Sequence, residues 1–236
     1  MLKTNDKEIH LQEKTQAFLA IWHDLLDEGK TDWEKWHTYE HIPERVGISG
    51  FLAGRRYMNY NDPEQCCFTM YEGSGLSVFK STPYLKRLNN PTPWTKKSAL
   101  TFKNFTRGAC KCVSTSGKKN GYGGALMTIR LLKGKNFSEN SKYFDQLTSI
   151  TNKLEGIITS TLGICNAENT FTETTERKLR KGTSETSLEG VLIIDGYDEI
   201  IIKEQSEKIL NIINSSAIDL KPQKIQTYNL SYILRE

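Results

Sequence analysis

The chain has 236 residues, enough for one large domain or two small ones, and its hydrophobic (37%) and aromatic (10%) residues suffice for a buried core. Its 32 basic and 28 acidic residues give a formal charge of +4, which is too balanced to indicate nucleic-acid binding. No run of about 18 apolar residues predicts a membrane span, and the polar start lacks the apolar segment of a signal peptide, so we expect a cytoplasmic protein with no membrane partner.

The chain contains five cysteines, and their number predicts reduced thiols. An odd count without an export signal is typical of a reducing compartment. Cys110 and Cys112 form a C-x-C pair, but no second pair with metal-binding spacing accompanies it. We therefore expect structural cysteines, the other three being Cys66, Cys67 and Cys165.

Hydrophobic periodicity predicts a first βαββαβ unit over residues 15–113, after a flexible polar arm at 1–14. Thr31 and Glu34 form a capping box that starts a helix near residue 32, and Pro43 is expected to end this helix near residue 41 or 42. In chain order the expected elements are a strand at 16–24, that helix, strands at 50–60 and 66–72, a helix at 75–88 stepped at Pro83, and a strand at 99–113.

The same order of elements follows a linker rich in Gly, Ser and Lys at 114–124. This second unit covers residues 125–236 and contains a polar insert at 168–187. Its expected strands are 125–133, 157–167, 188–198 and 224–236, and its expected helices are 138–156 and 199–216.

Two βαββαβ units predict an α+β fold of two ferredoxin-like units, each with a four-stranded antiparallel sheet and helices on one face. The first strand is apolar on both sides, with Phe18, Ala20 and Trp22 on one face and Leu19 and Ile21 on the other. The face without helices therefore also needs cover. We expect the two sheets to face one another and form an α+β barrel within one chain.

The two units differ in chemistry. All four tryptophans and all four histidines lie before residue 95. This asymmetry favours the first unit as the candidate functional half and the second as a supporting half.

Residues 37–41 read HTYEH, the His-x-x-Glu-His pattern of the inverted zinc proteases. On a helix His37 and His41 share a face and could reach one metal. However, the expected helix at 75–88 carries no Asp or Glu as a further ligand, and Pro43 interrupts the motif's own helix. We expect no metal here, with one histidine lining a pocket and the other capping or packing.

The wider stretch WHTYEHIPERVGISGFLAGRRY resembles the dimeric α+β barrel superfamily, and most of all its EthD-like branch. The resemblance covers about residues 16–112, whereas the second half is similar in topology alone. It rests on Trp33, Trp36, Glu40, His41, Pro43, Gly50, Phe51, Arg56 and Tyr57.

This resemblance implies a small pocket for apolar or aromatic molecules between the sheet and its helices. Proteins of the superfamily carry out cofactor-free oxygenation, lactone isomerisation and polyketide cyclisation, and some branches bind haem. Members with a single unit build the barrel by homodimerisation, so a fused repeat departs from them. The resemblance leaves open whether the fused chain itself forms a homodimer.

Three histidines are candidates for chemistry. His23 ends the first strand beside Asp24, and a histidine oriented by a carboxylate is a common general base. Its alternative is an exposed residue at a strand end. His41 is the second catalytic candidate, and its alternative is hydrogen bonding to free helix carbonyls. His37 is a candidate for contact with the ligand.

Arg55 and Arg56 lie on opposite faces of one strand, so at least one must point inward or find a partner. An inward arginine could bind a carboxylate or phenolate, or it could form a salt bridge to Glu40, Glu44 or Glu72. Two tyrosines, Tyr57 and Tyr71, are core or rim residues that could touch a ligand.

The stretch RLNNPTPWTKK (87–97) predicts a rigid, irregular loop with an aromatic side chain to bury. It is either a lid that places Asn89, Asn90 and Trp94 over the pocket or a fixed connection between helix and strand.

These observations lead to three hypotheses. The first is an enzyme that acts on a small aromatic or lactone-like molecule by cofactor-free acid–base chemistry, with His23 and His41 as its groups. The second is a binding protein without catalysis, and the third is a haem-binding protein with a histidine as axial ligand. A cavity of about 300–1,000 Å³ with converging His and Arg favours an enzyme, whereas a barrel filled by side chains favours the second. We expect no cofactor, with haem as the minor alternative.

Overall fold

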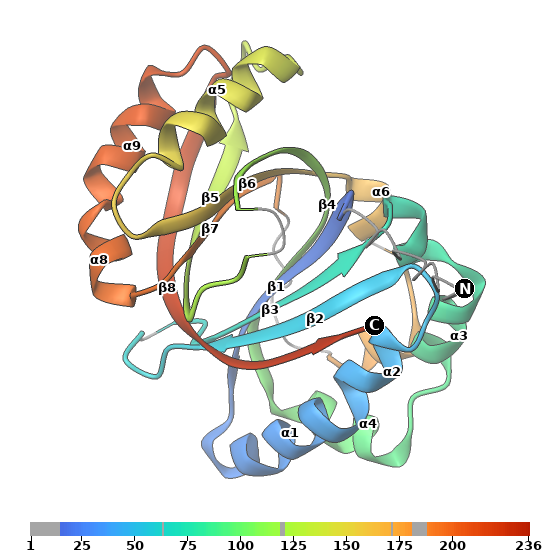
Figure 1. Cartoon of the computed structure of the whole chain (residues 1–236). Coiled ribbons are helices and arrows are strands. Elements are labelled where there is room, and N and C mark those ends of the chain that lie inside the picture. Colours follow the sequence, from blue (N-terminus) through green and yellow to red (C-terminus); the bar gives the residue numbers. More distant parts are fainter. Residues whose placement is uncertain (1–14, 63, 119–120, 171, 181–187) are drawn as a thin grey trace, which may run out of the picture.

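The computed structural model of the protein describes residues 15–62, 64–118, 121–170, 172–180 and 188–236, which build a closed barrel of strands with helices on its outside (Figure 1). The predicted arm at 1–14 and residues 181–187 of the polar insert lie outside the described residues. In the described ranges, no helix has the length and apolar character needed to cross a bilayer.

The eight strands close in the order β1-β3-β2-β8-β5-β7-β6-β4, and every neighbouring pair is antiparallel. Each half has the same internal order, and the pairs β2–β8 and β4–β6 form two seams between the halves. This confirms the predicted pair of ferredoxin-like units in one barrel. The strands are β1 (Ala17–Leu25), β2 (Phe51–Met58), β3 (Cys67–Gly73), β4 (Phe102–Gly117), β5 (Ala125–Lys133), β6 (Ile157–Cys165), β7 (Gly190–Gly196) and β8 (Leu220–Arg235).

The helices form two separate groups on the outside of the barrel (Figure 1). The first half carries α1 (Lys30–Trp36), α2 (Ile42–Val46), α3 (Thr82–Asn89) and α4 (Pro93–Ser98), with 3₁₀ turns at Asp27–Gly29, Leu76–Lys80 and Ala99–Thr101. The second half carries α5 (Ser141–Thr151), α8 (Glu199–Glu204) and α9 (Ser206–Ser215). Two short helices of the polar insert, α6 (Ala167–Thr170) and α7 (Thr175–Leu179), lie elsewhere: α7 packs against α3 and α4 of the first half.

The barrel strands bury both of their faces, as their sequences predict. Phe18, Ala20 and Trp22 lie in the barrel interior, in one apolar cluster with residues of the second half such as Tyr228. Leu19 lies on the opposite face, in the cluster beneath the first-half helices. The corresponding layer of the second half is a separate cluster made of aliphatic side chains, methionine and phenylalanine. Side chains therefore fill the barrel interior and the second-half layer.

The helix that Pro43 was expected to end continues through the proline. HTYEH forms a π-helical turn (His37–His41) between α1 and α2, in which the Ile42 N–H donates to the carbonyl of His37, five residues back. Pro43 then lies in the first turn of α2. A regular turn would place the carbonyl four residues back against the proline ring, and a widened turn is a known way for a helix to pass one. The predicted end near residue 41 was therefore wrong.

Two strands extend beyond their expected bounds. β4 continues to Gly117, into the first residues of the expected linker, because it pairs with β6 of the second half as far as Thr159. β8 begins at Leu220 and pairs with β5. Both extensions depend on a partner strand that is distant in sequence, so local periodicity could not predict them.

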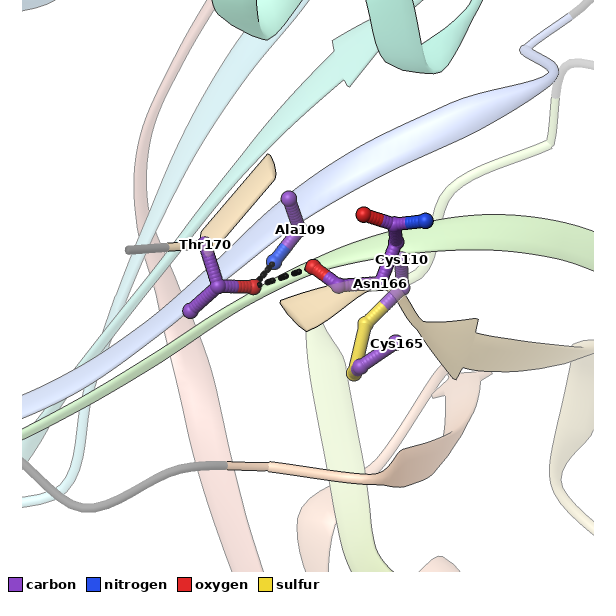
Figure 2. Close-up of a disulfide and its surroundings, with 5 residues drawn as sticks. All are labelled: Ala109, Cys110, Cys165, Asn166 and Thr170. Carbon is purple, nitrogen blue, oxygen red and sulfur yellow. Dashed lines mark hydrogen bonds between the residues drawn. A yellow bond between two sulfur atoms is a disulfide. The ribbon is translucent and has the colours of Figure 1, made fainter. Parts of the chain in front are cut away.

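The prediction of reduced cysteines is wrong at two positions. Cys110 of β4 and Cys165 of β6 are directly opposed in the seam and form a disulfide (Figure 2). Thr170 of α6 lies beside them; its hydroxyl accepts from the Ala109 N–H at 3.0 Å and donates to the Asn166 carbonyl at 2.8 Å. The two cysteines are 55 residues apart in the chain, and only the pairing of the halves brings them together. Three cysteines, Cys66, Cys67 and Cys112, are thiols.

Candidate functional site

A small cavity of about 40 Å³ lies between the first-half sheet and its helices. His23 enters from β1, and His37 and His41 enter from the π-helical turn. The sequence motif and the strand-end histidine therefore meet in one place. We call this the histidine cavity.

Two tryptophans of α1 hold the histidines of the π-helical turn. The rings of His37 and His41 are stacked, with centroids 5.5 Å apart and planes at 22°. Trp33 stacks on His37 at 4.5 Å, and Trp36 packs on His41 at 4.3 Å. Because all four rings are 9% exposed or less, their orientations are fixed by packing.

All three histidines are neutral at pH 7. Burial lowers the pKa of His23 from 6.5 to about 4. Burial, followed by the charge of Arg56, lowers the pKa of His37 well below its usual value, and burial followed by the charge of Arg45 does the same for His41. A buried imidazolium would need compensating hydrogen bonds or charges that these sites do not supply.

Hydrogen bonding to the histidine rings is incomplete. His37 Nε2 lies 3.4 Å from the Tyr71 hydroxyl, but within the described residues Nδ1 of His37 and Nδ1 of His41 have no hydrogen-bond partner. A buried polar atom without a partner costs about 1–3 kcal/mol, so each such atom needs an explanation.

His23 is not oriented by the carboxylate of Asp24, contrary to the expectation from sequence. Its Nδ1 lies 3.2 Å from the backbone carbonyl of Asp24. The carboxylate instead accepts from the Cys66 N–H at 2.9 Å and from the Asn104 amide at 2.7 Å. His23 is held edge-on by Phe102 and Trp33, an apolar setting that explains its lowered pKa.

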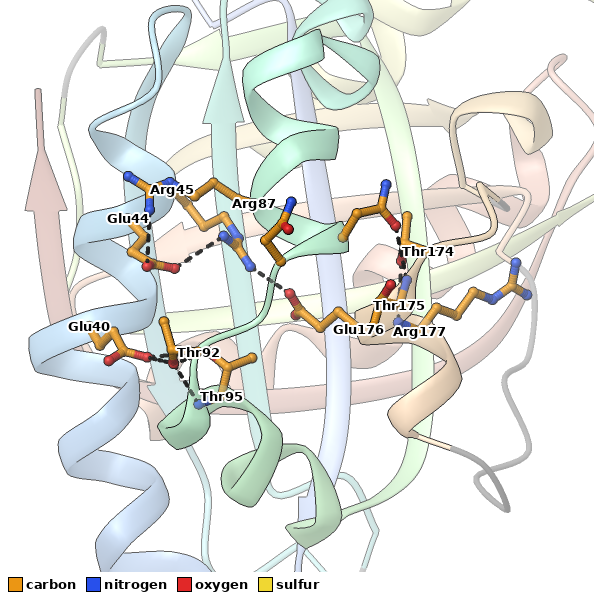
Figure 3. A network of polar contacts seen from close by, with 12 residues as sticks. Glu40, Glu44, Arg45, Arg87, Thr92, Thr95, Thr174, Thr175, Glu176 and Arg177 are labelled. Atoms are coloured by element: carbon orange, nitrogen blue, oxygen red, sulfur yellow. Dashed lines mark hydrogen bonds and ion pairs between the residues drawn. The ribbon is translucent and has the colours of Figure 1, made fainter.

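Arginines add positive charge to the same cavity. Arg45 of α2 donates to Glu176 Oε2 of α7 at 2.7 Å (Figure 3). Arg180 follows α7; its guanidinium lies 3.8 Å from Glu176 and 4.4 Å from the ring centroid of Phe105. Glu176 therefore has two cations close to it.

Arg107 of β4 also lines the cavity, and no carboxylate of the part of the chain that the structure describes balances its charge. The residue is 7% exposed. Its Nε has no hydrogen-bond partner, and no carboxylate of the described residues lies within ion-pair distance of it. A buried guanidinium in this state is unusual, because buried charges are normally paired.

Sequence reasoning missed Arg45, Arg107, Glu176 and Arg180. The sequence did carry a signal for Arg107, because Phe105, Arg107 and Ala109 are two residues apart and so share one face of a buried strand. An arginine between two apolar residues on such a face indicates a buried charge. Glu176 and Arg180 belong to the polar insert of the second half, whose position over the first half has no local signature. The cavity is thus completed by both halves.

Only four of the ten predicted site residues line this cavity: His23, His37, His41 and Tyr71. Arg55 and Tyr57 point instead into the barrel interior. There Arg55 lies 2.9 Å from Glu72 in an ion pair and donates to Asp195 at 2.8 Å and to the Tyr57 hydroxyl at 2.8 Å. The Glu72 salt bridge was one of the alternatives that the sequence left open.

Arg56 faces the helices but does not reach the cavity. Its guanidinium donates to the Glu34 carbonyl at 3.1 Å and to the Thr38 hydroxyl at 3.0 Å, so it braces α1 against β2.

The irregular loop predicted at 87–97 is mostly helical, because α3 extends to Asn89 and α4 covers Pro93–Ser98. None of its three candidate residues lines the cavity. Asn89 accepts from the Thr175 N–H at 3.1 Å and so anchors α7. Asn90 donates to the Lys86 carbonyl at 2.8 Å, and the Trp94 indole donates to Asp32 at 3.3 Å.

Glu40, the acid of the HTYEH motif, is committed to packing on the other side of the helix (Figure 3). Its Oε1 accepts from Trp36 Nε1 at 3.2 Å, from the Thr92 hydroxyl at 2.5 Å and from the Thr95 hydroxyl at 3.2 Å. In the described part of the chain, no group of three or more His, Cys, Asp or Glu side chains is arranged to hold a metal ion. Glu40 therefore joins α1 to α4.

We expect Glu40→Ala to lower the free energy of unfolding by about 1–3 kcal/mol, because it leaves three donors without their charged acceptor. Chemical denaturation checks this. Glu34→Ala is the matched control: it removes a carboxylate from the same helix that accepts one exposed hydrogen bond from Tyr60, and it should change stability by less than about 1 kcal/mol. Equal losses in the two variants would contradict the role of Glu40.

No family model matches the chain, and no curated protein is similar to it in sequence. Solved structures are similar in fold over nearly its whole length. An anthrone oxidase-like protein superposes with a TM-score of 0.63 at 7% identity, covering 95% of this chain and 94% of that one. A haem-binding protein from Thermus thermophilus gives 0.53 at 11% identity, covering 94% and 95%. A mutant chlorite dismutase from Candidatus Nitrospira defluvii, in complex with cyanide, gives 0.53 at 7% identity, covering 93% and 92%.

These similarities correct the expectation that no cofactor is involved, because proteins of this architecture include a haem-binding one. We therefore tested the histidine cavity for haem. It offers histidines of the type that ligate haem iron, but its volume of about 40 Å³ is enough for a few water molecules and not for a porphyrin. The residues as arranged here do not fit haem. What the comparisons establish is the fold: a ferredoxin-like α+β barrel with two units in one chain.

Proposed function

We propose that the protein binds a small aromatic acid in the histidine cavity, with the carboxylate of the ligand paired to Arg107. The observation that carries this proposal is the buried guanidinium of Arg107, which has no carboxylate partner among the described residues. Leaving a charge buried and unpaired costs several kcal/mol, and an anionic ligand removes that cost.

The charges around the cavity favour an anion. Three arginines line it, Arg45, Arg107 and Arg180, against one carboxylate, Glu176, while the histidines are neutral. Arg45 pairs with both Glu44 and Glu176, and Arg180 lies 3.8 Å from Glu176, so the cavity arginine without a carboxylate partner among the described residues is Arg107. A buried positive charge of this kind attracts and holds a negative group.

The walls of the cavity suit an aromatic body. Tyr71, Tyr84, Phe102 and Phe105 contribute rings, as the EthD-like resemblance leads one to expect. At about 40 Å³ the cavity holds a carboxylate and the atoms next to it. A larger body requires α7, which contributes Glu176 to the wall, to move outward when the ligand binds. The Nδ1 atoms of His37 and His41 have no partner among the described residues, and each can donate to or accept from a polar group of the ligand according to its tautomer.

We place binding before catalysis on the evidence of the pKa values. A general base works best when its pKa is near the working pH, whereas burial lowers the pKa of His23 to about 4. The histidines are therefore neutral hydrogen-bonding groups first, each with one donor and one acceptor nitrogen. Bound anionic charge would raise their pKa, and on this proposal proton transfer begins with the ligand in place.

Binding of matched acids and amides tests the proposal. Benzoate and acetate are titrated by calorimetry and by the fluorescence of Trp33 and Trp36, with benzamide and acetamide as uncharged counterparts. We expect benzoate to bind, more tightly than acetate, and benzamide not to bind. Arg107→Met should weaken the binding at least about 30-fold, because truncating one partner of a buried charge pair costs about 2–5 kcal/mol.

Stability separates loss of a binding group from loss of structure. Arg107→Met should unfold at the same or higher denaturant concentration than the wild type, since it removes an unpaired buried charge. Arg235→Met makes the same change at an exposed position of β8 and should leave binding intact. If acid and amide bind alike, if neither acid binds, or if Arg107→Met binds like the wild type, the proposal is wrong.

A further inference from the structure

A second, larger cavity of about 320 Å³ lies at one end of the barrel, where β3 and β4 begin and β5 ends. Its volume falls within the range of about 300–1,000 Å³ that is usual for ligand sites. It shares no lining residue with the histidine cavity. We call it the barrel-end cavity.

Arg130 of β5 is the charged group in its wall that has only neutral partners. Its guanidinium donates to the Gln65 side-chain oxygen at 2.6 Å and to that of Gln226 at 3.0 Å, and it lies 5.4 Å from the centre of the Trp22 ring. Its Nε is buried and has no hydrogen-bond partner among the described residues. The described residues also place no carboxylate within ion-pair distance of Arg130.

The other charged groups in the wall are already engaged. Glu64 pairs with Lys224 at 2.9 Å, and Glu189 accepts from the backbone N–H of Lys133 at 2.7 Å. No carboxylate of the described residues is therefore paired with Arg130 at ion-pair distance.

The backbone of this wall is held in an uncommon conformation. Within the described residues, three non-glycine residues have positive φ, and two of them, Gln65 (58°) and Asn104 (49°), line this cavity. The Gln65 amide donates to the Asn104 carbonyl at 2.7 Å, which ties the two together. Such conformations cost about 1–3 kcal/mol each and concentrate at functional sites. The hydrogen bonds of the Gln65 amide to Asn104 and Thr106 hold its side-chain oxygen against Arg130.

The remaining wall is aliphatic. Leu131 and Leu188 are buried, and Leu132 is 42% exposed. A cation at one side and three leucines at the other match the two ends of an aliphatic acid.

We propose that the barrel-end cavity binds an aliphatic carboxylate, with its carboxylate on the Arg130 guanidinium and its hydrocarbon chain along Leu131, Leu132 and Leu188. This site is independent of the one proposed for aromatic acids. It uses a different arginine, the opposite face of β4 and an aliphatic wall.

Hexanoate is the probe that tests this site, with 1-hexanol as its uncharged counterpart. Amide chemical shifts are followed by NMR during each titration. We expect hexanoate to shift the amides of Arg130, Leu132 and Lys224, and hexanol to bind at least about tenfold more weakly, which corresponds to about 1.4 kcal/mol. Arg130→Gln should weaken hexanoate binding by at least the same factor.

The controls separate the two sites and guard against misfolding. Arg107→Met should bind hexanoate like the wild type at the barrel end, and so should Arg235→Gln. Arg130→Lys keeps the cation but loses the forked geometry, so it should fold and bind several-fold more weakly. Absence of hexanoate binding, equal binding of hexanol, unchanged affinity in Arg130→Gln, or shifts confined to the surroundings of His37 would each overturn the inference.

Discussion

Replacing Arg55 by methionine is expected to lower the free energy of unfolding by about 3–5 kcal/mol, the cost of removing one partner from a buried ion pair. Arg55, Glu72 and Asp195 are each less than 5% exposed, and the arginine links β2 of the first half to β7 of the second across the barrel interior. Without Arg55, two carboxyl groups would face each other with no cation in an apolar interior. Urea denaturation of the wild type and the variant measures the loss.

Arg56→Met is the matched control, because Arg56 is the next residue of the same strand and has neutral partners, the Glu34 carbonyl and the hydroxyls of Thr38 and Ser231. Arg56→Met should lower the free energy of unfolding by about 1–3 kcal/mol, since it leaves no carboxylate unpaired. Adding Asp195→Asn to Arg55→Met should recover part of the stability. Equal losses in the two arginine variants would show that the buried ion pairs do not carry the effect.

The second large effect expected is a loss of stability in mild acid. A buried histidine whose pKa is lowered in the folded state favours unfolding as pH falls, because the unfolded chain takes up the proton first. For His23 the stability is fully present above pH 6.5 and is lost as pH falls from there through about 4. This difference in pKa corresponds to roughly 3 kcal/mol of unfolding free energy lost through His23 alone. His37 and His41 act in the same direction.

Denaturation at a series of pH values from 8 to about 4.5 measures this effect. Burial raises the pKa of Asp195, so its contribution has the opposite sign: stability falls as pH rises from 3.8 through its folded pKa. His23→Phe preserves an aromatic ring beside Phe102 and Trp33 and removes one titrating group. The free energy of unfolding of this variant should depend less steeply on pH than that of the wild type. The difference in slope should correspond to about one proton fewer taken up on unfolding. Identical slopes would contradict the buried neutral state of His23.

The fold could be predicted because its signals are local. Alternation of Leu19 and Ala20 between two apolar faces indicates a strand covered on both sides, and a repeated order of elements indicates the second unit. The course of the chain at Pro43 could not be predicted in this way, because the widened turn is a compromise between a proline and a helix whose tryptophans are anchored in the core. The disulfide between Cys110 and Cys165 depends on a strand pairing between the halves.

The candidate site was predictable in its histidines but not in its charges. The spacing of His37 and His41 placed both on one side of a helix, where the structure has them. The adjacent arginines of β2 were candidates because they lie on opposite faces of one strand, so that one of them must point inward. Yet the arginines in the cavity are Arg45, Arg107 and Arg180, none of which sequence reasoning named, and Glu176 comes from an insert of the other half. Which charges meet in a cavity depends on tertiary contacts that no local pattern records.

The two seams have a consequence for how many chains make one barrel. The connection between β4 and β5 is short, so each half meets the other at a high effective concentration and the barrel closes within the chain. Deleting residues from this connection would prevent that closure and favour exchange, in which the second half of one molecule pairs with the first half of another. The same registers would then form between two polypeptides, and Cys110 of one would be linked to Cys165 of the other. Such pairs would run as dimers on a gel without reductant and as single chains on a gel with it. The Cys110–Cys165 disulfide therefore reports whether the barrel is made by one chain or by two.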